Sequence, residues 1–306
     1  MTTLDQLILT KVPFLTDGGI ETELIHHDHF DLPQFSAFVL LFDEMGQAAL
    51  SRYYNRYLDL AETRDRGFVL DTATWRANLG WAARLGLAEA DIRQANRLAA
   101  ALARDLKSRR AWSDQIVING CLGPAGDGYG PGKILSPETA GELHAAQLET
   151  LAEEAVEMVT ALTLTHTGEA IGIARRAQSL GLPVALSFTV ELDGRLPVGQ
   201  TLADAIAEVD DATGGAPLFY GINCAHPTHF LDRLRGAWLS RIGLIRANAS
   251  AQSHKVLDAI AELDDGDPLE FGVLNADVAR RLPNLKIIGG CCGADTRHIA
   301  AVATWV

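Results

Sequence analysis

Residues 158–189 read MVTALTLTHTGEAIGIARRAQSLGLPVALSFT, and this stretch indicates most directly how the chain folds. It begins with an apolar run, Met158–Thr163, continues with an amphipathic stretch, Glu169–Leu180, and closes with a second apolar run, Val184–Thr189. Both runs are too apolar on their two faces for a sheet that has one side in water. They are typical of parallel strands covered by helices, so the stretch predicts a strand–helix–strand unit.

Similar units recur along the chain, about eight times in all. The expected strands are Phe14–Asp17, Phe68–Thr72, Ile116–Gly120, Met158–Thr163, Val184–Thr189, Leu218–Asn223, Ile242–Asn248 and Lys286–Gly290. The amphipathic stretches between them include Gln47–Thr63, Glu138–Glu157, Glu169–Leu180, Leu202–Asp210 and Thr296–Ala303, with Ser136, Thr201 and Asp295 as expected N-caps. Repeated units of this kind form a parallel sheet that is either doubly wound or closed. Eight units without an obvious second domain favour an α/β fold of the closed kind, a single (β/α)8 TIM barrel that spans residues 1–306 as one domain.

The composition limits the classes of protein to which the chain can belong. Its 306 residues carry a formal net charge of -13, which the phosphates of a nucleic acid would repel. No run approaches the roughly 18 consecutive apolar residues of a membrane span, and the N-terminus lacks the features of a secretory signal. The four cysteines, two of them adjacent, do not suggest a disulfide framework. We therefore expect a cytoplasmic protein that binds small molecules and neither nucleic acid nor membrane.

One irregular stretch interrupts the regular alternation of strands and helices. Residues 122–135 follow the third expected strand and contain five glycines and two prolines. Loops of this length are uncommon in compact domains unless they serve a function. Because the active sites of such barrels lie at the C-terminal ends of the strands, we expect an active-site loop here.

Cysteines gather at two of these strand ends. The segment Gly289-Gly290-Cys291-Cys292-Gly293 closes the eighth strand, and Cys224 ends the sixth. Neighbouring side chains on a regular strand point to opposite faces, but glycines on both sides let the backbone turn so that both sulfurs converge. Soft thiolates select zinc, and three protein ligands leave a fourth position open, as in catalytic zinc sites. The pattern therefore indicates a zinc site formed by Cys224, Cys291 and Cys292.

Other residues near these cysteines have simpler interpretations. A single cysteine is most often a small buried hydrophobic residue, and we interpret Cys121 in this way. His226 and His229 are metal ligands by type, but three thiolates and a substrate already fill a tetrahedral zinc ion. We therefore leave these three residues out of the predicted metal site.

Five segments carry a resemblance to a known family. They are TDGGIETEL (16–24), DTATWRAN (71–78), SFTV (187–190), GINC (221–224) and GGCCG (289–293). Through them the chain resembles the homocysteine S-methyltransferase family across nearly its whole length. The resemblance implies a zinc-binding (β/α)8 barrel in which the three zinc cysteines are Cys224, Cys291 and Cys292.

The resemblance also implies a reaction and two small-molecule partners. Zinc makes a bound thiol lose its proton, and the thiolate of homocysteine then attacks a methyl group on a sulfonium, a quaternary ammonium or a methylated cofactor. We therefore expect a zinc-dependent methyltransferase of methionine biosynthesis, with Zn2+ as its cofactor, a thiol acceptor and a methyl donor. Beyond the zinc-activated substrate thiolate we expect no catalytic group, because the protein mainly positions the two reactants in line.

Several residues are candidates for acceptor binding. They are Asp17, Gly18, Gly19, Thr72, Thr163, Asn223 and Gly290. In the family the Asp-Gly-Gly turn helps to hold the amino-acid part of homocysteine, so Asp17 and the two glycines inherit that role. From the residues alone, the glycines could instead form a tight turn, and Glu21 could be an acid that favours a helix N-terminus. Thr72 and Asn223 end their strands beside the expected pocket and could equally bond local backbone.

Two positions depart from the family's pattern. Many members carry Phe-Glu-Thr at the end of the fourth strand, where the acid contacts the substrate ammonium, but here Thr163 stands in the place of that acid. Glu169 is the nearest acid downstream and belongs to the following helix pattern. Residues 246–250 read RANAS in place of the more usual Pro-Asn-(Ser/Gly)-Gly-Glu. Since a lost carboxylate removes a charge-assisted hydrogen bond of about 1.5–3 kcal/mol, the acceptor is either homocysteine or a related thiol.

Two other functions stay open on the sequence. A zinc hydrolase would need a zinc-bound water and an acid that acts as a base, but such sites favour histidine and carboxylate ligands. A zinc-binding barrel that has lost catalysis and binds or senses its ligand is compatible with the substitution at Thr163. Incubation with homocysteine and a panel of methyl donors discriminates among the three functions.

Overall fold

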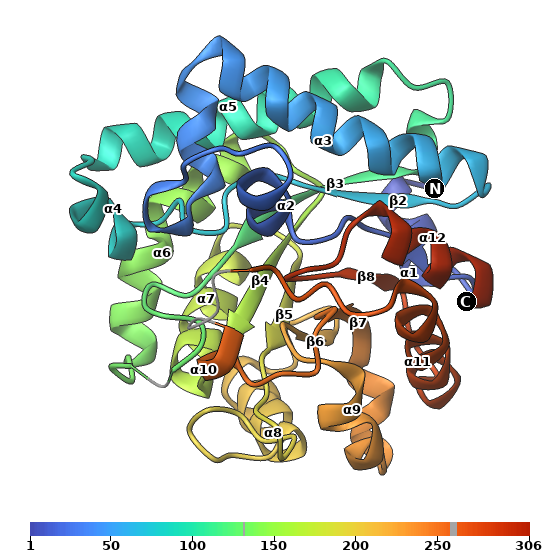
Figure 1. Cartoon of the computed structure of the whole chain (residues 1–306). Coiled ribbons are helices and arrows are strands. Elements are labelled where there is room, and N and C mark those ends of the chain that lie inside the picture. Colours follow the sequence, from blue (N-terminus) through green and yellow to red (C-terminus); the bar gives the residue numbers. More distant parts are fainter. Residues whose placement is uncertain (131, 258–261) are drawn as a thin grey trace.

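The computed structural model describes residues 1–130, 132–257 and 262–306. Its strands are parallel and follow one another in sequence order around a closed barrel, so that β1 also pairs with β8 (Figure 1). The strands are β1 (Phe14–Leu15), β2 (Phe68–Asp71), β3 (Ile116–Leu122), β4 (Met158–Leu164), β5 (Val184–Phe188), β6 (Tyr220–Asn223), β7 (Ile242–Ala247) and β8 (Ile287–Gly290). Each strand lies within its expected range or extends at most two residues beyond it, and the predicted (β/α)8 barrel is confirmed.

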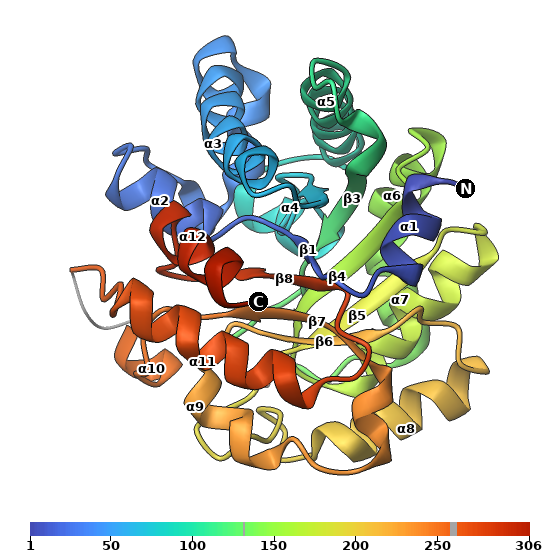
Figure 2. The ribbon, with the colours of Figure 1, turned by 90° about the vertical axis from the view of Figure 1, so that its right-hand side faces the viewer.

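Helices surround the barrel on all sides (Figures 1 and 2). They are α1 (Thr3–Leu9), α2 (Ile20–His26), α3 (Glu44–Thr63), α4 (Leu79–Leu85), α5 (Glu89–Ser108), α6 (Pro137–Glu153), α7 (Thr167–Ser179), α8 (Leu202–Thr213), α9 (Pro227–Phe230), α10 (His254–Leu257), α11 (Pro268–Arg281) and α12 (Thr296–Trp305). Short 3-10 segments cover Pro33–Phe35, Ala37–Phe42, Ser113–Gln115, Leu231–Arg233 and Ala237–Arg241. Within the described ranges, no helix has both the length and the apolar character that crossing a bilayer requires.

The amphipathic stretches that the sequence predicts correspond to α3, α6, α7, α8 and α12. Their expected N-caps are present: the side chains of Ser136, Thr201 and Asp295 each accept a hydrogen bond from a backbone N–H of the first turn. Such caps satisfy amide groups that the helix itself leaves unpaired, which fixes where each helix begins. Each helix start therefore follows from the local sequence.

The interior of the barrel has an apolar layer and a polar layer. Among the residues of one buried cluster, Val69, Val117 and Leu244 belong to β2, β3 and β7. Leu7 of α1 joins the same cluster and is completely buried, so this helix, which the sequence does not predict, completes the apolar layer. A second and larger apolar cluster fills the space between the strands and the outer helices.

Polar side chains follow the apolar ones along the same strands. Side chains on a strand alternate between its two faces, so the residue two positions further on faces the same way. Val69 is thus followed by Asp71, and Leu244 by Arg246, both of which are buried. The C-terminal end of the barrel therefore contains a buried polar layer, and the candidate site is built on it.

Candidate active site

Three cysteine sulfurs meet at the C-terminal end of the barrel. The Sγ atoms of Cys224 and Cys291 lie 2.6 Å apart, and those of Cys224 and Cys292 lie 3.7 Å apart. All three sulfurs lie within 4.8 Å of one another. Across the part of the chain that the structure describes, no other group of three cysteine, histidine or carboxylate side chains is close enough together to hold an ion.

The backbone around the cysteines explains why the sulfurs converge. Cys224 follows β6 in a left-handed conformation with φ of 53°, which is uncommon for a residue with a side chain. After β8 the chain turns tightly, because the amide of Ala294 donates to the carbonyl of Cys291 at 3.1 Å and Gly293 has φ of 76°. The end of β7 lies between these segments, accepting one hydrogen bond from the amide of Cys224 and another from that of Cys291. The turn that the glycine-flanked pair predicts is therefore present.

The three sulfurs have the right chemistry and nearly the right spacing for zinc. A tetrahedral site with Zn–S distances of about 2.3 Å places its sulfurs about 3.8 Å apart. The Cys224–Cys292 distance of 3.7 Å already has this value, and the sulfurs of Cys224 and Cys291 would separate by about 1 Å. Hydrogen bonds from Cys224 and Cys292, together with the charge of Arg246, hold the pKa of the Cys291 thiol well below its usual range. The cluster thus fits a zinc ion held by three thiolates.

A cavity of about 50 Å³ lies in front of the sulfurs. The predicted acceptor-binding residues that line it are Asp17, Gly18, Gly19, Thr72 and Thr163. The two other predicted residues, Asn223 and Gly290, are not part of the lining.

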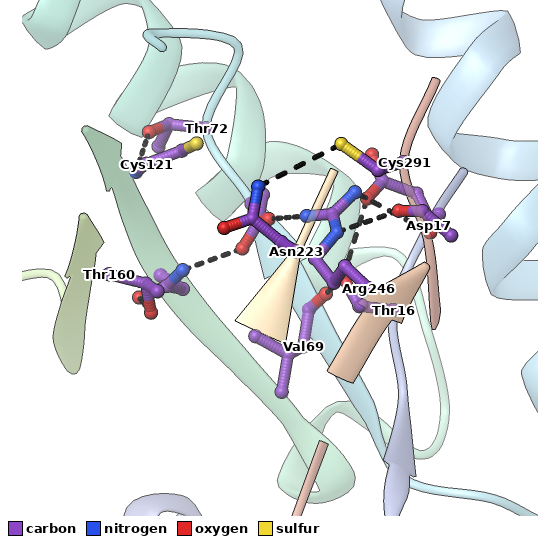
Figure 3. A network of polar contacts seen from close by, with 12 residues as sticks. Thr16, Asp17, Val69, Thr72, Cys121, Thr160, Asn223, Arg246 and Cys291 are labelled. Atoms are coloured by element: carbon purple, nitrogen blue, oxygen red, sulfur yellow. Dashed lines mark hydrogen bonds and ion pairs between the residues drawn. The ribbon is translucent and has the colours of Figure 1, made fainter. Parts of the chain in front are cut away.

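Asn223 and Gly290 instead support residues of the lining. The amide group of Asn223 donates to the Thr163 hydroxyl and accepts from the Thr163 backbone N–H, both at 2.8 Å. Its Nδ2 also lies 3.9 Å from the Cys291 sulfur (Figure 3). The carbonyl of Gly290 accepts a hydrogen bond from Nε of Arg246 at 2.8 Å. Thr163 has φ of 62°, so the chain bends at the end of β4 where this pair forms.

The two glycines after Asp17 are needed for close packing against the cysteine turn. A Cβ atom on Gly18 would lie 2.1 Å from the carbonyl oxygen of Ala294, and one on Gly19 would lie 2.5 Å from that of Cys291. The amide of Gly19 also donates to the carbonyl of Ala294 at 2.8 Å. The glycines therefore allow close packing against the cysteine turn and line the cavity, but neither has a positive φ and residues 16–19 form no turn of their own.

A buried arginine lies at the centre of the polar layer. The guanidinium of Arg246 forms an ion pair with Asp17 (Figure 3). It forms a second ion pair with Asp71 and donates to the carbonyl of Gly18 at 2.9 Å. Burial opposes its charge, but the two carboxylates raise the pKa of Arg246 well above its usual value, so it stays charged. Burial raises the pKa of Asp71 to about 6, against the opposing effect of Arg246. The layer is therefore held together by one cation that two carboxylates share.

A third carboxylate faces the cavity without such a partner. Glu21, in the first turn of α2, is part of the cavity lining and is only partly exposed. Loss of hydration raises the pKa of its carboxyl to about 7, while Arg76 acts in the opposite direction. Within the described residues, no ion pair is formed by its side chain and no other residue donates a hydrogen bond to it.

The predicted active-site loop brings an aromatic residue to the sulfurs. The hydroxyl of Tyr129 lies 3.2 Å from the sulfur of Cys292 and 3.8 Å from that of Cys224. Burial and the neighbouring cysteines raise the pKa of Tyr129 well above its usual value, so it remains a phenol. Residue 131 of the expected loop lies outside the described residues.

A second, wider chamber adjoins the first. It has a volume of about 450 Å³, and Tyr129 and Cys292 line both chambers. Two reactants could therefore approach the sulfur cluster from different sides.

The remaining candidates have structural roles. Glu169 is buried and accepts hydrogen bonds from the amide of Ala125 at 2.7 Å and from His144 at 2.9 Å, and it does not line the cavity. His226 caps α9, and Nε2 of His229 bonds the carbonyl of Ala251 at 2.9 Å, so neither ring joins the sulfurs.

Three residues of the site were not predicted from the sequence as functional groups. Arg246 is visible as a departure from the family's pattern, but its role depends on carboxylates from two other strands. Glu21 looks like any first-turn acid, and only its position on the cavity sets it apart. Tyr129 is one residue of a glycine-rich loop. Because it is far from the cysteines in sequence, its contact with them cannot be predicted from the sequence.

Comparisons with known proteins show the family to which the chain belongs. Residues 14–306 match the family described as homocysteine S-methyltransferase. A search of curated protein sequences finds no significant match. The fold is similar to crystal structures of the homocysteine methyltransferase MmuM from Escherichia coli, in an oxidised form (21% identity, TM-score 0.76) and in a metallated form (18% identity, TM-score 0.76), with 99% of each chain covered in both cases. The chain therefore belongs to the homocysteine S-methyltransferase family of methyltransferases.

Proposed function

We propose that this protein is a zinc-dependent S-methyltransferase that moves a methyl group from a small donor to the thiol of homocysteine or a related thiol. The product would be methionine or its analogue. The observation that carries the proposal is the cluster of Cys224, Cys291 and Cys292, whose sulfurs face a cavity at the C-terminal end of the barrel. Family membership gives the reaction class, and the cluster supplies the chemistry that the reaction needs.

The three cysteines would hold the metal and leave one position for the acceptor. When bound, zinc would keep the acceptor sulfur as a thiolate, which is the nucleophilic form of a thiol. Tyr129, which contacts two of the sulfurs, would shield this position from water. Arg246 keeps the carboxylates of Asp17 and Asp71 in place behind the acceptor cavity.

The methyl donor would enter through the wider chamber. That chamber meets the acceptor cavity at Tyr129 and Cys292, so the donor would reach the acceptor sulfur past these two residues. Methyl transfer needs the nucleophile, the methyl carbon and the leaving group in line. Two adjoining chambers that share Cys292 would give each reactant its own space beside the cluster.

The chemistry of the cluster disfavours a zinc hydrolase. Such an enzyme would need an acid beside the metal-bound water, and hydrolase sites favour histidine and carboxylate ligands. The cysteines are free thiols, which suits a reducing compartment, and we propose that the chain works in the cytoplasm as one domain.

Two measurements on one preparation test the proposal. Protein purified under reducing conditions should contain close to one zinc ion per chain by elemental analysis. Incubation with homocysteine and a panel of sulfonium, quaternary ammonium and methyl-folate donors should yield methionine with at least one donor. Zinc without methyl transfer from any donor would support a binding or sensing protein instead, and absence of zinc would remove the basis of the proposal.

A further inference from the structure

The acceptor cavity contains one carboxylate that the rest of the protein does not neutralise. Asp17, Glu21 and Asp71 are the acids among its lining residues. Asp17 and Asp71 share Arg246, and they also accept hydrogen bonds from Tyr53 at 3.0 Å and from Asn119 at 2.6 Å respectively. Glu21 has no such partner among the described residues.

Nearby acids confirm that this is unusual for the region. Glu23, two residues further along α2, is buried but forms an ion pair with Arg56 and accepts a hydrogen bond from Tyr57 at 2.7 Å. Elsewhere Glu169 is paired with His144. A carboxylate that loses much of its hydration without gaining a partner costs free energy, and Glu21, although partly exposed, is in this position.

The charges around Glu21 do not supply that cation. Arg76 is the positive group that acts on it, but no ion pair joins the two side chains, and the guanidinium of Arg76 instead packs on Trp81 at 3.9 Å and on Trp75 at 4.7 Å from the ring centroids. Asp17 and Cys291 add negative charge near Glu21. A cationic group that entered the cavity would therefore find an attractive position next to the sulfur cluster.

We infer that Glu21 binds the ammonium group of the acceptor, so that the acceptor is an amino thiol and not a simple thiol or a thiol acid. The inference rests on the proposed function, because it assumes that the acceptor sulfur sits at the cysteine cluster in the same cavity. With the sulfur held there, a carboxylate in the lining orients the chain of the acceptor by its other end. Glu21 is a binding residue in this account and takes no part in methyl transfer.

The test uses three thiols that differ in one group each. Homocysteine, 3-mercaptopropylamine (which lacks the carboxylate) and 4-mercaptobutanoate (which lacks the ammonium) are titrated into the zinc-loaded protein by calorimetry. The unaltered protein should bind the two amino thiols about tenfold to a hundredfold more tightly than 4-mercaptobutanoate, the effect of a charge-assisted hydrogen bond. In Glu21→Gln this preference should vanish while the affinity for 4-mercaptobutanoate is kept or improved, and Glu21→Asp should retain part of it.

A matched control separates this role from a simple effect on a helix. Glu44 is an exposed acid in the first turn of α3, away from the cavity lining, so Glu44→Gln makes the same chemical change at another helix start. It should leave all three affinities and the zinc content unchanged.

Three results would contradict either the role of Glu21 or the proposed function. If Glu21→Gln keeps the preference for amino thiols, or weakens all three thiols equally, Glu21 does not bind the ammonium. If the unaltered protein binds 4-mercaptobutanoate as tightly as homocysteine, the acceptor is not selected by its amino group. If the zinc-loaded protein binds none of the thiols, the proposed function fails and the inference fails with it.

Discussion

Arg246 is a single residue that supplies the counter-charge for two buried carboxylates of the barrel. It is 5% exposed, and its guanidinium joins β7 to Asp17, after β1, and to Asp71 at the end of β2. Two carboxylates and one cation leave a net negative charge in a region from which water is largely excluded. Breaking a buried ion pair by removing one member leaves its partner charged and unpaired, which is strongly destabilising.

Replacement of Arg246 by methionine should therefore destabilise the fold. The free energy of unfolding should fall by roughly 3–5 kcal/mol at pH 7, because Asp17 and Asp71 lose their counter-ion. Urea denaturation of the metal-free, reduced protein measures this change without interference from zinc binding.

A surface arginine provides the control for that measurement. Arg52 is exposed on α3, and Arg52→Met should change the free energy of unfolding by no more than about 0.5 kcal/mol. If Arg246→Met changed the free energy of unfolding as little as Arg52→Met does, Asp17 and Asp71 would not need Arg246 as their counter-ion.

The metal cluster allows an equally local prediction. Cys291→Ser or Cys292→Ser should reduce the zinc content from about one ion per chain to a small fraction of it, because a hydroxyl is a poor ligand compared with a thiolate. Cys121→Ala should keep the metal, since Cys121 is buried and outside the cluster. Elemental analysis of the three variants side by side decides the matter, and zinc retained without Cys291 or Cys292 would place the metal elsewhere.

At the residue scale, the sequence predicts what depends on local chemistry. The glycines around Cys291 and Cys292 predict a turn, and two thiols in one turn predict a metal site. Glu21 could not be recognised in the same way, because an acid in the first turn of a helix stabilises the helix whether or not it faces a cavity. The charges that act on its carboxyl belong to residues far away in sequence, such as Cys291 and Arg76.

At the scale of elements, the active-site loop is held near both ends by the start of α7. The carboxylate of Glu169, at the start of α7, accepts from the amide of Ala125. Near the other end of the loop, the amide of Leu135 lies 3.4 Å from Nε2 of His166, which caps the same helix. Burial opposes the charge of Glu169, but the hydrogen bond with His144 contributes most to keeping the pKa of its carboxyl below the usual value. The loop that carries Tyr129 is thus positioned by α7.

Glu169→Gln should loosen this loop without removing the metal. The neutral amide weakens both the hydrogen bond to Ala125 and the pairing with His144, since hydrogen bonds to a charged group are about twice as strong as neutral ones. Hydrogen–deuterium exchange should increase in peptides from residues 123–130, while zinc content stays at the level of the parent. Glu138→Gln, a change at an exposed acid of α6, is the control and should leave the exchange of this loop unaltered. Equal exchange in both variants would show that Glu169 does not hold the loop.

The elements themselves were largely predictable, for a physical reason. Strands of a parallel barrel are buried on both faces, so β4 and β5 appear in the sequence as short apolar runs. Helices such as α6 and α8 begin at side chains that cap them. The short helices α1 and α2 span only seven residues each and have no clear period, and Leu7 is buried because of where α1 packs rather than because of its neighbours in sequence.

At the scale of the whole molecule, negative charge dominates both the surface and the site. The formal net charge is -13, and the acceptor cavity adds buried carboxylates to it. A buried carboxylate resists ionisation, so the protein binds a proton there that the unfolded chain would release. Glu21 therefore makes its own contribution to the pH dependence of the free energy of unfolding.

The predicted pH dependence follows from the pKa of Glu21, which rises from 4.5 to about 7 in the folded protein. Between these two values the folded state binds more protons than the unfolded state, so the free energy of unfolding falls as the pH rises through this window. The contribution is complete below pH of about 4.5, and its loss amounts to roughly 3 kcal/mol above pH of about 7. Glu21→Gln carries no titrating group, so its stability relative to the parent should rise by that amount between pH 4.5 and pH 8.

Comparing the two proteins at each pH cancels the titration of the groups that do not interact with Glu21, whereas its charged neighbours Asp17 and Cys291 remain part of the difference. Urea denaturation of both proteins under reducing conditions gives the difference directly, and Glu44→Gln should track the parent at every pH because its acid is exposed. An amino thiol at saturating concentration should favour the ionised carboxylate, so the parent should regain stability at pH 8 while Glu21→Gln gains less. A difference between parent and Glu21→Gln that stays constant from pH 4.5 to pH 8 would mean that the carboxylate is already neutralised in the folded protein, and the cavity would then have no unpaired charge to offer an acceptor.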